Sequence, residues 1–283
     1  MANIFSGLEN FGLGELKDLD IYNTGSTDKK DSDKEADKPK ITEADLVFDK
    51  TYTCPVCDNE FKAKAVKTGK VKLLGADSDL RPKYQLVDSL KYDAVVCPGC
   101  GYSALNRFFT YMTAPQAKLI KEQITVNFRG IEDSGEIYTY DDAIARHKLV
   151  LVNTIVKKAK NSERAYTCLK IAWLLRGKIE TLPTDTADYN TEVAKLRAEE
   201  DEFIKNAYEG FTAAFSKEVF PMCGMDENTV TYLVADLARR CGKFDEAGRW
   251  ISKVLVSRDA NERIKSKARD LKDLIVQGKK DNA

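Results

Sequence analysis

The same short motif occurs twice in the sequence: a cysteine, a proline, one further residue and a second cysteine. It lies in TCPVCDNEF at residues 53–61 and in VVCPGCGY at residues 95–102. Two cysteines at this spacing can turn both sulfurs toward one point, and the proline between them restricts the turn. A glycine after the second cysteine adopts a left-handed conformation without strain, which suits Gly101. The first stretch has Asp58 at that position, and aspartate is among the residues that best tolerate a positive φ.

The two cysteine pairs together predict a metal site. Cys54, Cys57, Cys97 and Cys100 make a four-thiolate set, which is the closed ligand shell of structural zinc. Iron in the same cage has the same pattern, and one pair alone is also compatible with a thiol–disulfide couple. We therefore expect zinc, with iron as the alternative, to hold a small β-rich, zinc-ribbon-like module together. Four thiolates leave no coordination position for a substrate, so metal catalysis is not expected.

Composition and charge restrict the classes of function. The chain has 283 residues, and its 45 basic and 45 acidic side chains balance. A balanced chain creates no long-range field toward nucleic acid or an anionic membrane. The first residues lack the basic start and apolar run of a secretory signal, and no stretch is apolar enough to span a bilayer. We expect a cytoplasmic protein without membrane contact, whose seven cysteines stay reduced.

The beginning of the chain divides into two segments. Residues 1–25 carry large apolar side chains spaced by glycines and acids, and we interpret them as a docking segment for a partner or for the protein's own surface. Residues 26–44 are rich in lysine and acids, and up to Lys40 they contain no large apolar side chain. Such a segment cannot offset its ordering entropy by burial, so a disordered linker is predicted there.

Residues 45–110 have short, strand-like patterns. EFKAKAV at residues 60–66 alternates apolar with basic or small side chains, which is typical of a half-buried strand. KVKLL at residues 70–74 is a second such run, and the two runs together predict a hairpin. After Gly101 the pattern is expected to change to helix.

Residues 111–283 are predicted to be helical. Thr113 and Gln116 form a potential capping box around Pro115, which is tolerated in a first turn. Asp226 is a candidate N-cap. Periodic apolar faces predict further helices near residues 141–158, 163–176, 192–217, 227–241, 245–256 and 261–277.

A degenerate repeat is visible in these helices. Equivalent positions at offsets 0, 3, 7 and 11 are Tyr166, Leu169, Trp173 and Gly177, then Thr231, Val234, Ala238 and Gly242. The spacing resembles tetratricopeptide repeats (TPR), in which pairs of antiparallel helices pack closely. A helical bundle with the same periodicity is the alternative. The overall fold class is therefore α+β and mostly α: a zinc-ribbon-like module followed by an α-helical, TPR-like array.

Four longer stretches carry a family resemblance. They are LVFDKTYTCPVCDNEFKAK (46–64), DSDLRPKY (77–84), KYDAVVCPGCGYSAL (91–105) and FPMCGMDENTVTYLVADLARRCGKFDEA (220–247). In combination they resemble the bacterial family known as domain of unknown function 2225, over roughly residues 46–277. The resemblance implies a cytosolic bacterial protein with two cysteine knuckles and a helical, repeat-like C-terminal part. It implies no activity.

Other polar residues have a functional and a structural interpretation. Asp77, Asp79, Arg81 and Tyr84 could form a small polar recognition site, or an Asp–Arg pair could brace a loop. Five lysines around the predicted hairpin could contact phosphate or form a solvated strand face; they are Lys62, Lys64, Lys67, Lys70 and Lys72. His147 is the only histidine, and its place on a helix predicts packing rather than catalysis.

The combined prediction is a metal-stabilised, non-enzymatic adaptor that binds a protein or peptide through TPR-like helices. The alternatives are a nucleic-acid-binding zinc ribbon and an iron or thiol redox protein. A protein or peptide partner is expected, and nucleic acid is not. The sequence offers no nucleophile–base pair, phosphate loop or open metal site that would support an enzyme.

Overall fold

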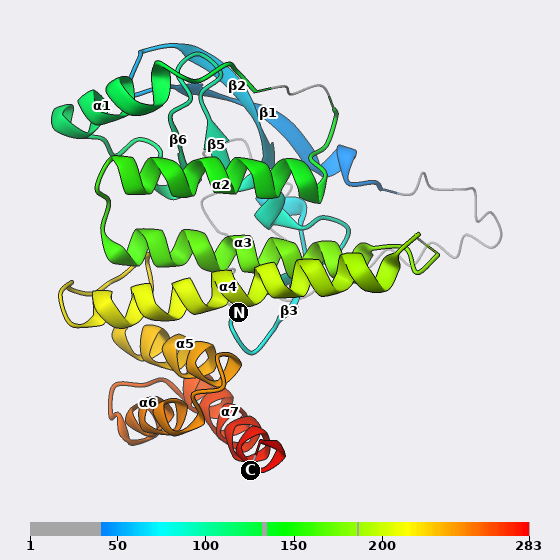
Figure 1. Cartoon of the computed structure of the whole chain (residues 1–283), viewed down its shortest axis with the longest axis vertical. Helices are drawn as coiled ribbons and strands as arrows, with labels where there is room; N and C mark the ends of the chain where they lie inside the picture. Colours follow the sequence, from blue (N-terminus) through cyan, green and yellow to red (C-terminus); the bar gives the residue numbers. More distant parts are fainter. Residues whose placement is uncertain (1–40, 132–134, 186, 283) are drawn as a thin grey trace, which may run out of the picture. The chain divides into compact units, whose positions relative to one another are not determined.

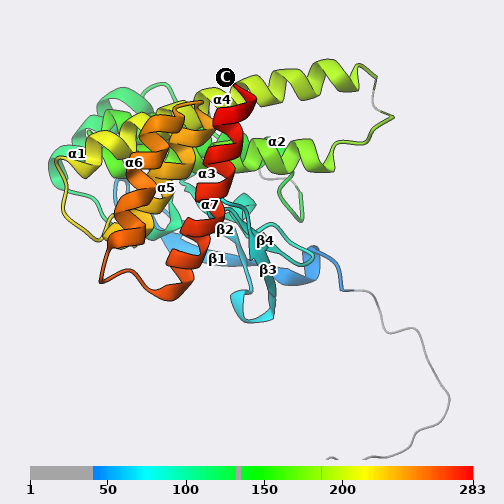
Figure 2. The same cartoon turned by 90° about the horizontal axis from the view of Figure 1, so that it is seen from below.

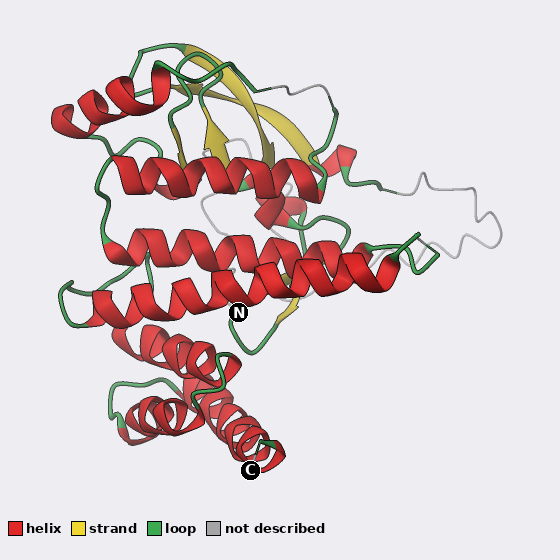
Figure 3. Cartoon of the chain, in the orientation of Figure 1, coloured by secondary structure: helices red, strands yellow, loops and turns green. Residues whose placement is uncertain are grey.

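Short strands come first along the described chain and long helices follow (Figures 1 and 3). The computed structural model describes residues 41–131, 135–185 and 187–282. The predicted docking segment and residues 26–40 of the predicted linker lie outside this part. Residues 41–44 were also assigned to the linker, but Glu43 is anchored: its carboxylate accepts a hydrogen bond from Tyr92 at 2.7 Å and pairs with Lys91 at 2.6 Å.

In the described part of the chain the strands form three separate antiparallel pairs: β1 with β2, β3 with β4 and β5 with β6. Phe61 and Ala63 are buried on β2 while Lys62 between them is exposed, which confirms the half-buried strand. The bounds are β1 (Val47–Thr53), β2 (Glu60–Val66), β3 (Leu73–Ala76), β4 (Pro82–Tyr84), β5 (Ala94–Val96) and β6 (Ser103–Leu105).

Two sequence predictions about the strands were wrong. Residues 60–66 do not form a hairpin with 70–74; β2 pairs along its whole length with the preceding β1, and β3 turns back onto β4. The chain after Gly101 does not turn directly to helix, because Ser103–Leu105 pairs with β5. A cysteine-containing turn joins β1 to β2, and another joins β5 to β6. This strand pairing determines the structure more strongly than the local pattern of apolar and polar residues.

Seven helices follow in the described chain, and their predicted positions were close. Thr113 and Gln116 form the expected capping box, and Asp226 accepts from the Thr229 amide at 2.7 Å. The bounds are α1 (Ala114–Ile120), α2 (Tyr140–Val156), α3 (Asn161–Thr181), α4 (Tyr189–Phe215), α5 (Glu227–Arg240), α6 (Phe244–Val256) and α7 (Glu262–Asp281). The α+β class, mostly α, is therefore confirmed.

Helices that follow one another in the sequence also pack against one another, and α2 lies between the strands and the later helices. It contacts β5 and β6 on one side and α3 on the other, and α3, α4 and α5 follow in order (Figure 1). A large apolar core connects α3 to α7. A second core surrounds the cysteines and includes Phe61, Tyr102, Phe109 and Ile120. Figure 2 shows the same arrangement from below, with the strands beside the helices.

Close approaches between helices depend on glycines. A Cβ on Gly210 of α4 would come within 2.8 Å of Ala165 of α3, and one on Gly177 would come within 2.6 Å of the Tyr140 ring. Gly242 instead follows the end of α5 at φ +72° with open space around it. Gly177 and Gly242, expected to be equivalent repeat positions, thus have different roles. TPR-like character stays a prediction.

Candidate metal centre

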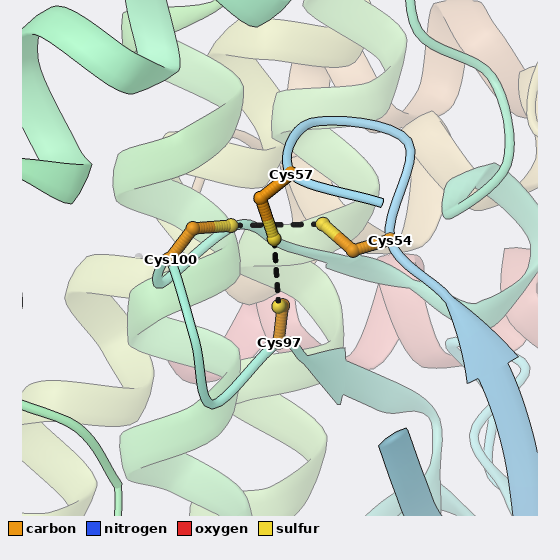
Figure 4. Close-up of side chains that lie close together, drawn as sticks. All are labelled: Cys54, Cys57, Cys97 and Cys100. Carbon is orange, nitrogen blue, oxygen red and sulfur yellow. Dashed lines mark hydrogen bonds between the residues drawn. The ribbon is translucent and has the colours of Figure 1, made fainter. Parts of the chain in front are cut away.

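The four cysteines come from two equivalent turns at the ends of paired strands. Cys54 directly follows β1, and Cys57 lies in the turn that leads to β2. Cys97 directly follows β5, and Cys100 lies in the turn that leads to β6. The two pairs are about forty residues apart in sequence, but all four side chains converge in space (Figure 4).

The two knuckles have matching backbone hydrogen bonds. In the first, the Asp58 amide donates to the Cys54 carbonyl at 2.9 Å. In the second, the Gly101 amide donates to the Cys97 carbonyl at 3.0 Å. Asp58 has φ 60° and Gly101 has φ 76°, so both occupy the left-handed conformation that the sequence predicts. A Cβ on Gly101 would also come within 2.6 Å of the Phe128 ring. Glycine is therefore required there by conformation and by space.

The sulfur positions fit a tetrahedral metal. The Sγ atoms of Cys54 and Cys100 are 3.6 Å apart, those of Cys57 and Cys97 are 3.7 Å apart, and all four lie within 4.8 Å of one another. Bonds of about 2.3 Å to a central zinc would place tetrahedral sulfurs about 3.8 Å apart. A disulfide requires about 2.05 Å. The cluster could thus hold a metal ion, while the spacing alone does not distinguish zinc from iron.

The surroundings of the sulfurs favour a structural centre. Cys54, Cys97 and Cys100 are buried, and Cys57 is exposed. Backbone amides of Val56 and Cys57 donate to the Cys54 sulfur, as expected for a knuckle. Four protein ligands complete a tetrahedral shell, and no position is left for a substrate or an activated water. The chemistry available to a bound ion is therefore cross-linking of the two hairpins.

Without a cation, the clustered thiols compete for negative charge. The neighbouring thiols of Cys100 and Cys54 lower the pKa of the Cys97 thiol below its usual value. The hydrogen bonds to Cys54 and Cys97 raise the pKa of the Cys100 thiol. One thiolate in the cluster thus suppresses ionisation of its neighbours. A divalent cation removes this competition, because its charge stabilises all the thiolates together.

The predicted polar site of Asp77, Asp79, Arg81 and Tyr84 does not form one cluster: the first three residues join an ion-pair network, and Tyr84 lies elsewhere. Asp79 is fully buried, and its carboxylate accepts hydrogen bonds from Arg176 at 3.1 and 2.7 Å. Arg81, also buried, binds Asp77 at 2.7 Å and Glu180 at 2.6 Å. Burial opposes ionisation of Asp79, but the Arg176 hydrogen bonds and the Arg240 charge outweigh it, so its pKa falls below 3.8. These contacts tie the β3–β4 turn to the helices.

Tyr84, the fourth residue of that predicted site, lies apart from this ion-pair network and lines a cavity of about 720 Å³. One wall of the cavity is the β1–β2 hairpin, through Phe48, Lys50 and Tyr52. These three residues alternate along β1 and therefore share one face of the hairpin. The turn that closes this hairpin carries Cys54 and Cys57, so the metal centre anchors one wall of the cavity.

The helices form the opposite wall of the cavity, which includes Trp173 of α3. The Trp173 residue is 4% exposed, and its indole Nε1 has no hydrogen-bond acceptor among the described residues. Tyr166, Lys170 and Leu233 line the same wall. Lys170 is paired with Asp93 at 2.6 Å. The wall is therefore apolar and aromatic, with one paired charge and one donor that lacks an acceptor.

Apart from Tyr84, the residues that line the cavity were not predicted from the sequence as a site. Trp173 had the spacing of a core position, which it also occupies, and this spacing carries no information about its indole N–H. The alternation in VFDKTYT could have placed Phe48, Lys50 and Tyr52 on one face. Nothing in the sequence indicated that this face lies opposite α3.

The remaining cysteines and the histidine are separate from the metal centre. Cys168 and Cys223 are buried, and Cys241 is partly exposed. His147 is fully buried, and its Nδ1 lies 2.7 Å from the Ala143 carbonyl oxygen. Within the described residues, the four knuckle cysteines are the one cluster of potential metal ligands.

No helix in the described part of the chain has the length and apolar character needed to cross a membrane. Neither the curated proteins nor the solved structures contain a match to the chain. A family model described as "Uncharacterized protein conserved in bacteria (DUF2225)" matches residues 47–275. The matched region includes both cysteine knuckles, the cavity and helices α1 to α6 completely. Because the match covers most of the sequence, the chain belongs to this bacterial family.

Proposed function

We propose that this protein is a zinc-stabilised, non-enzymatic adaptor of the cytoplasm that binds an extended segment of another protein. The binding place is the cavity between the β1–β2 hairpin and the TPR-like helices. The observation that carries the proposal is the lining of this cavity, which combines apolar and aromatic side chains of the hairpin with those of the helices. Burial of such surface by a bound segment is favourable, by about 25 cal/mol for each Å² of apolar area removed from water.

The cavity favours a peptide as the occupant. Its volume of about 720 Å³ lies within the range of about 300–1,000 Å³ that is typical of ligand sites. Phe48 at the hairpin wall is 42% exposed, so an apolar side chain of the partner would cover it. Lys170 in the wall is neutralised by Asp93, which leaves Lys50 as the lining charge without a carboxylate partner among the described residues.

Charge at the rim suggests one feature of the partner sequence. Lys50 is exposed and has no carboxylate partner among the described residues; its ammonium lies 4.8 Å from the centre of the Tyr52 ring. An acidic residue next to the apolar side chain would pair with it. Such a rim pair contributes little affinity, but it would favour one orientation of the segment.

The role of the metal follows from the position of the knuckles. Zinc at Cys54, Cys57, Cys97 and Cys100 would hold the β1–β2 hairpin against the β5–β6 pair, and β5 and β6 contact α2. The metal would thereby keep the two walls of the cavity in place without contacting the ligand. Removing it should weaken peptide binding, even though no ligand atom reaches the centre.

The test is selection of short random peptides on zinc-loaded protein, followed by binding measurements with the enriched sequences. Phe48→Asp puts a charge at the cavity and should weaken binding at least tenfold, which corresponds to about 1.4 kcal/mol. Leu274→Asp is the matched control, because Leu274 is 46% exposed on α7 and does not line the cavity. Trp173→Phe keeps an aromatic ring but shortens the helical wall of the cavity, so a smaller loss is expected.

Fluorescence offers an independent readout. The chain has two tryptophans, so Trp250→Phe leaves Trp173 as the single reporter, and a peptide in the cavity should shift its emission. Peptides that bind equally to wild type, Phe48→Asp and Trp173→Phe would refute the cavity as the docking site. Iron instead of zinc in elemental analysis would refute the zinc assignment and favour the redox alternative.

A further inference from the structure

A second cavity, of about 710 Å³, lies at the connection between α2 and α3. Its walls come from the segment between β6 and α1, from the α2–α3 connection and from the turn before α5. They include Arg107, Tyr111, Lys158 and Lys160, together with Cys223. None of these residues lines the first cavity. The two cavities therefore offer different chemistry.

The charge of the lining is strongly positive. Among the described residues that line it, the basic ones are Arg107, Lys157, Lys158 and Lys160, and the one acidic residue is Glu163. Glu163 is paired with Lys157 at 2.7 Å, and that lysine is nearly buried. Arg107, Lys158 and Lys160 are exposed and have no carboxylate partner among the described residues. Three cations thus line one concave surface whose single described carboxylate is already paired, within a chain whose overall charge is zero.

The backbone at Lys158 adds an independent observation. Lys158 follows α2 with φ 53°, a left-handed conformation that favours glycine or asparagine at the end of a helix. A lysine there costs about 1 kcal/mol relative to glycine. A strained residue of this kind is a reason to look for function at its side chain. Lysine at this position brings a third cation to the cavity, where glycine would bring none.

Aromatic and apolar groups lie beside the cations. Tyr111 is 73% exposed at the cavity, and Phe108 and Met112 also line it. The Arg107 guanidinium lies 5.5 Å from the centre of the Phe108 ring, and its Nη1 donates to the Cys223 carbonyl. This interaction orients the guanidinium while other N–H groups remain to donate to an anion. An exposed tyrosine next to an oriented guanidinium and two lysines suits a ligand with a flat ring and a phosphate.

We propose that this cavity binds a small molecule in which a phosphate is joined to a planar ring, of the nucleoside monophosphate class. The phosphate contacts Arg107, Lys158 and Lys160, and the ring stacks on Tyr111. The proposal does not depend on peptide binding, because the two cavities share no lining residue. It also differs from nucleic-acid binding by the hairpin lysines, none of which lines this cavity.

The test uses the full zinc-loaded chain and calorimetric titration with AMP, GMP, CMP and UMP, each beside its nucleoside and inorganic phosphate. At least one monophosphate should bind more tightly than either of its parts, and rising salt should weaken it. Lys158→Gly should weaken binding about tenfold without loss of folding, because glycine suits the left-handed conformation. Lys160→Gln should act in the same direction, and Lys272→Gln on α7 is the matched control.

Three results would overturn the proposal. If none of the four monophosphates binds, no nucleotide site exists in the cavity. If inorganic phosphate binds as tightly as the nucleotides, the cations hold an anion without the ring. If Lys158→Gly and Lys272→Gln have the same effect, the ligand binds elsewhere. Tyr111→Ser separates the two parts of the ligand, because it should weaken the nucleotide and leave inorganic phosphate unchanged.

Discussion

The only histidine of the chain should remain neutral well below the ordinary pKa of its side chain. His147 lies fully buried on α2, and desolvation lowers its pKa from 6.5 to about 4. The nearby charge of Asp93 opposes this change, but Asp93 is already paired with Lys170. The Nε2 atom has no hydrogen-bond partner among the described residues. A second proton on the ring would therefore have no buried acceptor.

The sign and magnitude of the effect on stability follow from linkage. Because the folded pKa lies below the unfolded value, the unfolded chain binds the proton more readily between about pH 4 and 6.5. The free energy of unfolding is highest above this interval and falls as the pH decreases through it. The gap between 6.5 and about 4 corresponds to about 3 kcal/mol in total. About 1.4 kcal/mol of this should already be lost at about pH 5.5.

Two measurements check this prediction. NMR titration of selectively labelled histidine reports one residue, and its pKa should lie below 5. Denaturant unfolding near pH 7.5 and 5.5, at saturating zinc, should show a larger loss in wild type than in His147→Leu. The comparison cancels protons taken up by thiolates, because both proteins have the same knuckles. A measured pKa near 6.5, or equal losses in the two proteins, would show that the burial argument is wrong.

Further predictions concern the knuckles and the buried ion pairs. Cys97→Ser should reduce zinc content by elemental analysis and expose the strand amides to hydrogen exchange, whereas Cys241→Ser should keep one zinc per chain. Gly101→Ala should lower the free energy of unfolding by about 2–4 kcal/mol, because alanine is strained in the left-handed conformation and its Cβ would contact Phe128 closely. Asp58→Gly should raise the free energy of unfolding by up to about 0.5 kcal/mol. Unchanged denaturation midpoints would contradict both predictions. Asp79→Asn should cost about 3–5 kcal/mol by denaturant unfolding. Since the pKa of Asp79 is lowered, the wild-type advantage over this variant should be present above about pH 4 and be lost in more acidic solution.

Features that depend on neighbouring residues were predictable from the sequence. The spacing of Cys54, Cys57, Cys97 and Cys100 predicted their convergence, because each pair shares a turn whose backbone conformation depends on a few adjacent residues. The same reasoning predicted a left-handed residue at Gly101. Caps such as Thr113 and Asp226 were also predictable, since a cap involves side chains and amides only three residues apart.

Contacts between distant segments were decided by the tertiary structure. Residues 60–66 could pair with either neighbouring strand, and the alternation is the same for both partners. Trp173 has the spacing of a core residue whether or not its N–H meets an acceptor. Lys158 comes beside Arg107 only because the chain folds α2 back against β6. Periodicity specifies which face of an element is apolar, but the neighbour of that face depends on packing of the whole chain.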